Sequence, residues 1–377
     1  MARETALGVT TADVTTAGAI DCDLHPALAN TDVLLPYLDD YWRELVPIRT
    51  VENLDLAAYP PSVPLSGRAD WRPARGKPGS DLALLQAQAL DPFGTRLAIC
   101  NVLYGGPYLP NDDFAAALAR GINDWIAAEW LDRDPRLRSS IVIAPENVEL
   151  AVDEIERRAP NRRFVQVMVL AAGERPLGKR SYWPIYRAAA RHGLPLGIHA
   201  GSSYRHPPTS LGWGSYFLED YVAHAQSFQH QLLSLVAEGV FVEFPELKVV
   251  LIESGITWLP AFLWRFDKTW RGIRTETPWL DRPPTEIVRD HVRLTLQPVD
   301  EPPNEAQFER LLAHLGSEDM LLFSTDYPHW QFDGSDVLPP GLSAAHRRKI
   351  MIDNPLQTYP RLAEPAAASE LHREVAK

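Results

Sequence analysis

The stretch that decides the fold is SSIVIAPENVELAVDEIERRAPNRRFVQVMVLA, residues 139–171. It starts with the apolar run SSIVIAP (139–145), continues with the helical pattern VELAVDEIERRA and ends with a second apolar run, FVQVMVLA (164–171). Runs that are rich in β-branched residues and nearly continuously apolar are typical of parallel strands covered on both faces. A strand, a helix and another strand in this order predict a repeating βα unit.

The same alternation extends in both directions along the chain. Six further apolar runs predict strands: AIDCDLH (19–25), RLAICNVL (96–103), PLGIHAG (195–201), KVVLIES (248–254), VRLTLQP (292–298) and MLLFSTD (320–326). Eight strands that alternate with helices match the (β/α)8 count, so the predicted fold class is α/β, a TIM barrel. A doubly wound open sheet is the main alternative, because periodicity alone does not exclude it.

The predicted organisation is a single barrel over residues 18–361, between a flexible lead-in (1–17) and a C-terminal tail (362–377). Segment 47–80 is dense in Pro, Gly and Arg and shows no periodicity, so we interpret it as a long loop insertion. A loop that follows a barrel strand lies over the C-terminal mouth. We expect this insertion there, together with the irregular stretch 202–221 after the fifth strand.

Composition argues against several classes of partner. The formal net charge of −12 disfavours nucleic acid and anionic lipid, because binding to either needs clustered Lys and Arg. No run of about 18 apolar residues predicts a membrane span, and the N-terminus lacks the apolar core of a signal peptide. Cys22 and Cys100 lie in separate apolar runs, which predicts buried reduced thiols and a cytoplasmic location. A homodimer is the default expectation for an enzyme of this kind.

Polar residues at the predicted strand ends are the candidates for chemistry, because barrel enzymes place their active sites there. The first strand ends in Asp21, Asp23 and His25, whose alternation predicts that all three face one side. The fifth strand ends in His199, the sixth in Glu253 and the eighth in Asp326. Burying unpaired charges costs several kcal/mol, and a divalent cation would satisfy them. Mixed histidine and carboxylate ligands suit zinc, iron or manganese.

Each candidate also has an ordinary structural interpretation. An Asp-x-His pair is common by chance, and His199 alone fits a hydrogen-bonded core histidine. Asp326, which precedes Tyr-Pro, fits a turn or capping residue. Glu253 alone fits an ion pair with a nearby cation. The combination of the Asp-x-His pair, His199 and Asp326 is stronger than its parts, because all fall at the ends of predicted strands one, five and eight.

The segments IDCDLHP, LPLGIHAG, LVAEGVFVEFPELKVVLIESGITWLP, MLLFSTDYPH and KIMIDNPLQTYP together resemble the amidohydrolase-related family of the amidohydrolase superfamily. That family includes aminocarboxymuconate-semialdehyde decarboxylase and the resorcylate decarboxylases. The resemblance implies a distorted TIM barrel with one divalent metal ion per chain, held by Asp23, His25, His199 and Asp326. The sequence departs from the family at Glu253, where many members, the decarboxylases included, have histidine.

The expected function is a metal-dependent hydrolase that uses a metal-activated water to cleave an acyl bond (amide, ester, thioester or lactone). Asp326 would transfer the proton, and Glu253 would act as a base, as a ligand or as support for one. Zinc is the first expectation for the ion. The main alternative is a non-oxidative decarboxylase of a small carboxylic acid. A C–C hydrolase or hydratase, and a barrel that only binds a ligand, are further alternatives.

Four residues are candidates for contact with a hydrophobic small-molecule substrate: His329, Trp213, Trp258 and His224. His329 follows the strand-eight aspartate, and the tryptophans lie near predicted strand ends, where they would wall a pocket. The competing interpretations are a helix-start residue for His329 and aromatic core packing for each tryptophan.

Overall fold

The computed structural model describes residues 17–49, 67–74, 76–201, 206–329, 338–339 and 341–363. Its centre is one eight-stranded sheet in the order β1-β2-β3-β4-β5-β6-β7-β8, with every neighbouring pair parallel. The eight predicted strands are confirmed, although most are shorter than expected. They are β1 (Ile20–Leu24), β2 (Leu97–Cys100), β3 (Leu137–Val142), β4 (Phe164–Leu170), β5 (Leu196–His199), β6 (Val249–Ile252), β7 (Val292–Thr295) and β8 (Leu321–Leu322).

The two edges of this sheet meet and nearly close a barrel. The Cys22 amide donates to the Phe323 carbonyl at 2.9 Å, and Leu24 forms a parallel bridge with Tyr327. An open doubly wound sheet would leave its edge strands apart. The TIM barrel prediction is therefore confirmed.

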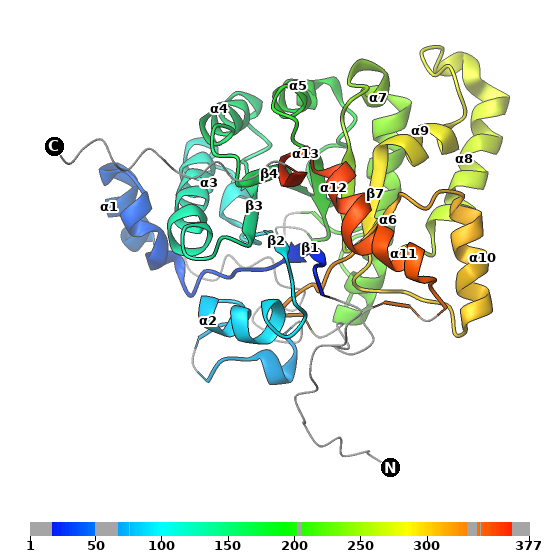
Figure 1. The fold of residues 1–377 in the computed structure, drawn as a ribbon. Helices are drawn as coiled ribbons and strands as arrows, with labels where there is room; N and C mark the ends of the chain where they lie inside the picture. The colour runs from blue at the N-terminus through cyan, green and yellow to red at the C-terminus, as the bar shows by residue number, and fades with distance from the viewer. Residues whose placement is uncertain are drawn as a thin grey trace.

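Helices surround the strands and follow one another around the barrel, as Figure 1 shows from α3 through α5 to α10. No described helix combines the length and apolarity that a membrane crossing requires. The helices are α1 (Asp40–Arg49), α2 (Leu82–Leu85), α3 (Asp112–Ile126), α4 (Val148–Arg158), α5 (Trp183–Arg191), α6 (Phe217–Ala237), α7 (Val240–Glu243), α8 (Leu259–Ile273), α9 (Pro284–His291), α10 (Glu305–Leu315), α11 (Ala344–Arg348), α12 (Asn354–Thr358) and α13 (Pro360–Ala363).

Local sequence explains where these helices start and which face they bury. Asn111 precedes α3, and its side chain accepts a hydrogen bond from the Phe114 amide, which satisfies an otherwise free donor of the first turn. Phe114, Leu118 and Ile122 recur at intervals of four, so they form one apolar stripe that faces the core. Asn147 caps α4 in the same way, through the Leu150 amide.

A small apolar cluster fills the barrel, and the C-terminal helices close its amino end. Tyr359 and Leu362 pack against inward-facing side chains of β1, β2, β4, β6 and β8. Arg361 fixes this position, since its guanidinium donates to the carbonyls of Phe164, at the start of β4, and His192, which directly follows α5. The carboxyl ends of the strands are thus left for the site.

Two predicted boundaries are wrong by a few residues. The helix α1 continues to Arg49, so the insertion predicted at 47–80 starts later; residues 50–66 lie outside the described ranges. The part after residue 66 is irregular and lies at the mouth, where Gly67 bridges His329. The predicted tail also starts too early, because Leu362 is buried in α13. The lead-in up to residue 16 and the tail from 364 lie outside the described ranges.

Candidate metal centre

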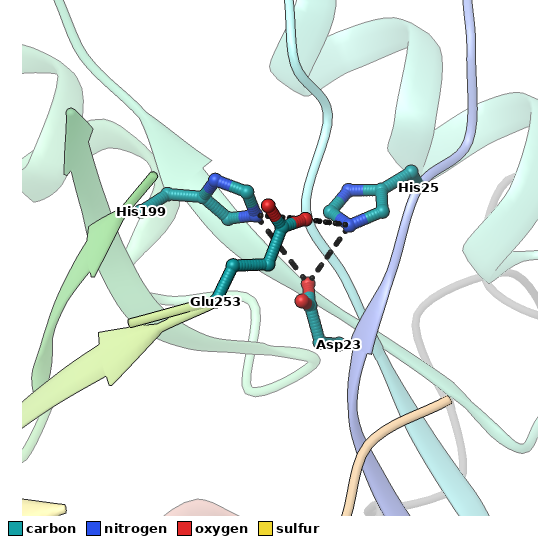
Figure 2. A group of neighbouring side chains, drawn as sticks. All are labelled: Asp23, His25, His199 and Glu253. Atoms are coloured by element: carbon teal, nitrogen blue, oxygen red, sulfur yellow. Dashed lines mark ion pairs between the residues drawn. The ribbon is translucent and has the colours of Figure 1, made fainter. Parts of the chain in front are cut away.

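Six predicted site residues converge at the carboxyl ends of β1, β5, β6 and β8. They are Asp23, His25, His199, Glu253, Asp326 and His329. Figure 2 shows four of them, with His25 and His199 on either side of the carboxylates of Asp23 and Glu253. Each residue of this group offers a ligand atom that lies within 4.8 Å of the others. A second such group shares two members with the first and consists of His25, Glu253, Asp326 and His329.

The two central imidazoles are held with one nitrogen turned toward the carboxylates. His25 Nδ1 lies 3.0 Å from the Asn101 carbonyl, and His199 Nδ1 lies 2.7 Å from the Ala200 carbonyl. A carbonyl only accepts hydrogen bonds, so each Nδ1 carries a proton that it donates. The Nε2 lone pair of a neutral ring then points into the cluster, which is the usual arrangement of a metal-ligating histidine.

The atoms in the middle of the cluster are nearly all acceptors. His25 Nε2 lies 3.3 Å from Asp23 Oδ1 and 3.2 Å from Glu253 Oε1, and it lies 2.9 Å from Asp326 Oδ1. His199 Nε2 lies 3.7 Å from Asp23 Oδ1 and 3.5 Å from Glu253 Oε1. Four buried atoms have no hydrogen-bond partner among the described residues: Asp23 Oδ2, His199 Nε2, Glu253 Oε1 and Asp326 Oδ2. Acceptors gathered without donors require a cation, and this donor set fits a divalent metal ion.

The pKa values of His25 and Glu253 show that the buried carboxylates stabilise positive charge on the neighbouring imidazoles. Burial opposes protonation of His25, but Asp23, Asp326 and Glu253 hold its pKa well above the usual value. Burial would raise the pKa of Glu253, yet the nearby imidazoles of His199, His25 and His329 keep it well below its usual range. Without a metal ion, protons on the imidazoles balance the carboxylates.

Asp326 and His329 form a closely hydrogen-bonded pair beside this centre. The distance between Asp326 Oδ1 and His329 Nδ1 is 2.5 Å. Burial and the neighbouring charge of Glu253 raise the pKa of Asp326 to about 6. Burial would lower the pKa of His329, but the Asp326 carboxylate raises it to about 9.

Two of the clustered carboxylates sit on strained backbone. Glu253 has φ 60° and Asp326 has φ 54°, and these are the only non-glycine residues of the described ranges with positive φ. Such conformations cost of order 1–3 kcal/mol in a non-glycine residue and gather at functional sites. Glu253 follows β6 and Asp326 lies beyond β8, and the carboxylates of both approach His25 Nε2.

Asn101, at the end of β2, supports the centre, although it is not among the residues predicted from the sequence. Its side-chain amide donates to Asp23 Oδ1 at 2.8 Å, and its carbonyl fixes His25. Its own Oδ1 accepts from the hydroxyl of Ser140 and from Gln166 Nε2. All these groups are buried. The available signal was a polar residue after the apolar run RLAIC.

The expectation that Asp21, Asp23 and His25 face one side is wrong. Asp21 pairs with Ala98 and Leu24 with Cys100, so three steps on β1 (21 to 24) span two on β2 (98 to 100). This bulge interrupts the alternation. The Asp21 carboxylate turns away from the cluster and accepts from the Thr325 hydroxyl at 2.6 Å and from the Thr325 amide at 3.0 Å, which ties β1 to the segment after β8.

The other residues predicted to contact substrate, His224, Trp258 and Trp213, lie in different environments. His224 is mostly buried on α6 and lies 3.6 Å from Asp220, and charges at Glu253 and His199 act on it. Trp258 donates to the Ser254 carbonyl and packs edge-on against Phe262. Trp213 is 42% exposed. Ser254 and Phe262, which Trp258 contacts, lie outside the cluster.

Tyr221 is a further residue that the sequence prediction missed. Burial raises the pKa of its phenol well above the usual value, and the charges of Glu253, Asp326 and Asp23 raise it further. The ring centroids of Tyr221 and His224 are 5.8 Å apart. The start of α6 therefore presents a neutral phenol and a histidine near the carboxylates.

Comparison with known proteins identifies the family of this chain. A family model for amidohydrolases matches residues 20–361. The chain belongs to the amidohydrolase family. It is 26% identical over 235 residues to gamma-resorcylate decarboxylase from Rhodococcus jostii, which covers 58% of this chain and 69% of that protein.

Solved structures of such enzymes share the fold. The 2,6-dihydroxybenzoate decarboxylase from Rhizobium has a TM-score of 0.67 at 20% identity, covering 91% of this chain and 99% of that chain. A dihydroxybenzoic acid decarboxylase from Polaromonas sp. JS666, whose crystal structure holds manganese and the inhibitor 2-nitroresorcinol, has a TM-score of 0.65 at 19% identity, covering 93% and 99%.

These relatives correct the predicted reaction. The sequence favours an acyl hydrolase, partly because Glu253 replaces a histidine that the decarboxylases carry. The curated relatives that match this amidohydrolase-family chain are nevertheless gamma-resorcylate decarboxylases. The hydrolase prediction is wrong, and its alternative, decarboxylation, is favoured. Loss of one imidazole was a poor guide, because Glu253 still points into the cluster.

Proposed function

We propose that this protein is a metal-dependent, non-oxidative decarboxylase of a small aromatic carboxylic acid with a hydroxyl group next to the carboxylate. The observation that carries the proposal is the buried group of acceptors formed by Asp23, His25, His199, Glu253 and Asp326. The names of the matched relatives support decarboxylation as the reaction. The substrate class follows from the same names and from the two adjacent oxygen donors that such an acid offers to a cation.

Asp23, His25 and His199 would hold the metal ion, and Glu253 and Asp326 complete the donor set. When bound, a divalent ion supplies Lewis-acid polarisation of the substrate oxygens. Three carboxylates beside two imidazoles suit manganese as well as zinc or iron. Manganese in the Polaromonas structure supports it as the first ion to test; zinc stays a prediction.

The reaction breaks the bond between the ring carbon and the carboxylate carbon. Carbon dioxide leaves, the electron pair stays on the ring carbon, and one proton must reach that carbon. Asp326 is the group that we assign to this transfer, because its Oδ1 is hydrogen-bonded to His329 Nδ1. His329, at the mouth, would pass the next proton to Asp326 and restore the pair.

Tyr221 and His224 are proposed to orient the substrate from α6. The raised pKa of Tyr221 keeps its phenol neutral, so it remains a hydrogen-bond donor beside three carboxylates. In this position the phenol would donate a hydrogen bond to an incoming carboxylate or phenolate oxygen. Trp213 and Trp258 stay predictions as walls of the pocket.

The direct test is turnover of a panel of hydroxybenzoates, with 2,6-dihydroxybenzoate first, by the manganese-loaded enzyme. We expect release of one carbon dioxide per acid consumed and, in D₂O, one deuterium at the vacated ring carbon. His199→Ala is expected to abolish turnover. His230→Ala is the matched control, because His230 is exposed on α6, and it should retain full activity. No carbon dioxide from any acid of the panel would contradict the proposal.

A further inference from the structure

A second candidate site lies at the opposite end of the barrel, near the starts of β6, β7 and β8. An open cavity of about 910 Å³ is lined there by Lys248, Arg289 and Arg293, among others. Lys248 directly precedes β6, and Arg293 is the second residue of β7. Arg282 also lines the cavity, and four cations around one cavity are unexpected in a chain with a net charge of −12.

Lys248, Arg289 and Arg293 form no ion pair within the described part of the chain. Lys248 Nζ donates to the Asp290 carbonyl at 2.7 Å, and Arg289 Nε donates to the Leu315 carbonyl at 2.7 Å. Arg293 Nη1 donates to backbone carbonyls only, including that of Val292 at 2.9 Å. Backbone carbonyls satisfy some donors but carry no net charge. The charge of Asp290 acts on Lys248 and Arg293, and that of Asp319 on Arg293, without an ion pair to either cation.

Arg293 is the most informative of the three. Its residue is 7% exposed, and burial lowers the pKa of its guanidinium. Its Nε and Nη2 have no hydrogen-bond partner in the ranges that the structure describes, since only Nη1 is engaged. Neither nitrogen is among the fully buried side-chain atoms that lack a partner, so both are open to solvent and to a ligand.

The acidic residues around the cavity do not neutralise these cations. Asp290 forms an ion pair with Arg282, and Asp319 lies 2.9 Å from Lys349 Nζ. Asp281 is exposed at the rim. Four Lys and Arg side chains and three Asp side chains line the cavity, so the charge that faces it is positive by one.

An apolar wall adjoins the cations. Trp279 is 41% exposed, and its indole nitrogen is fixed by the Ala237 carbonyl at 2.9 Å. Val242, 50% exposed, and the buried Phe241 line the same cavity. A fixed, half-exposed indole beside cations suits a ligand that combines a flat apolar body with an anionic group.

We infer that this cavity binds a small organic anion, a phosphate or carboxylate on an aromatic or apolar body. Its anionic group would meet Lys248, Arg289 and Arg293, and its body would lie on Trp279. This site is separate from the metal centre, because it lies at the amino ends of the strands. Its existence does not depend on the proposed decarboxylase activity.

Isothermal titration of the metal-loaded full chain with phenyl phosphate, inorganic phosphate and benzoate tests this inference. We expect phenyl phosphate to bind once per chain, and Lys248→Met to weaken that binding roughly tenfold or more, since a charge-assisted contact is lost. Trp279→Ala should weaken phenyl phosphate but leave inorganic phosphate unchanged. The stronger of phenyl phosphate and benzoate, both measured in His199→Ala so that the metal centre does not contribute, identifies the preferred anionic group.

The controls separate this site from others. Lys268→Met, at an exposed position of α8, should leave binding unchanged, and so should His199→Ala at the metal centre. Arg293→Met should abolish binding, and its thermal melting checks that it folds. If the three probes fail to bind at millimolar concentration, or if Lys248→Met binds phenyl phosphate as the unmodified protein does, the inference is wrong.

Discussion

The two ends of the barrel treat buried polar groups in opposite ways. At the amino ends, Arg361 is 3% exposed, and its guanidinium nitrogens donate to carbonyls of Ala159, Phe164 and His192. At the carboxyl ends, buried oxygens of Asp23 and Asp326 have no hydrogen-bond partner among the described residues. The surroundings of Arg361 are complete with the protein's own groups, whereas the metal centre needs a cation.

The two ends of the barrel also differ in backbone strain. The two non-glycine residues with positive φ in the described ranges, Glu253 and Asp326, both lie at the carboxyl ends. The strained backbone thus lies where binding of the metal ion and the substrate would offset its cost in free energy. The amino ends contribute to the stability of the barrel. Mutations at the two ends should therefore separate activity from stability.

The largest effect is expected from His199→Ala at the carboxyl ends. Removing a ligand should lower the metal content from about one ion per chain to none and reduce decarboxylation by about three orders of magnitude or more. Elemental mass spectrometry and the carbon dioxide assay measure both. His230→Ala should change neither, and metal retained in His199→Ala would remove that residue from the ligand set.

Asp326→Asn should be nearly as severe, but for another reason. The amide keeps the size of the side chain and one oxygen, so we expect metal to remain bound while turnover falls by about 10²–10⁴ through loss of proton transfer. A matching loss of deuterium incorporation at the ring carbon would accompany this fall. If the metal leaves instead, Asp326 serves mainly as a ligand; unchanged turnover would exclude the proton-transfer role.

Asn101→Ala should show an intermediate effect that sharpens the comparison. Loss of the 2.8 Å hydrogen bond to Asp23 should weaken metal affinity about 10–100-fold, as expected for a residue that orients a ligand. Chelator competition measures the affinity. Asn304→Ala is the matched control: it removes the cap of α10, so it should cost about 1 kcal/mol of stability and leave the affinity unchanged.

Asn101 also shows which kind of site residue could not be predicted from the sequence alone. Histidines and carboxylates at strand ends are recognisable because a charged side chain that follows an apolar run is costly to bury without a partner. An asparagine at the same place signals nothing by type, since it fits a turn equally well. Its role comes from contacts with Asp23, Ser140 and Gln166, which lie far apart in the chain.

The barrel itself could be predicted almost completely, because eight apolar runs leave few alternatives. Strand lengths could not: β8 has two residues, whereas seven were predicted at 320–326. The residues after Leu322 leave the ladder to carry Asp326 into the site. Alternation likewise failed on β1, because the bulge after Asp21 depends on pairing with β2.

The smallest effect on activity is expected from Arg361→Met at the amino ends. The substitution removes donors from the carbonyls of Ala159, Phe164 and His192 and leaves those groups buried without a charged partner. We expect a loss of about 3 kcal/mol in the free energy of unfolding, measured by urea denaturation of the metal-loaded protein. Metal affinity and turnover of the folded fraction should stay unchanged, because Arg361 contacts the start of β4 and the residue that follows α5 and no residue of the metal centre. A parallel loss of metal affinity would mean that the two ends are coupled through the barrel interior, where the Tyr359 hydroxyl contacts Gln166 at 3.3 Å, and the division between a stabilising end and a functional end would fail.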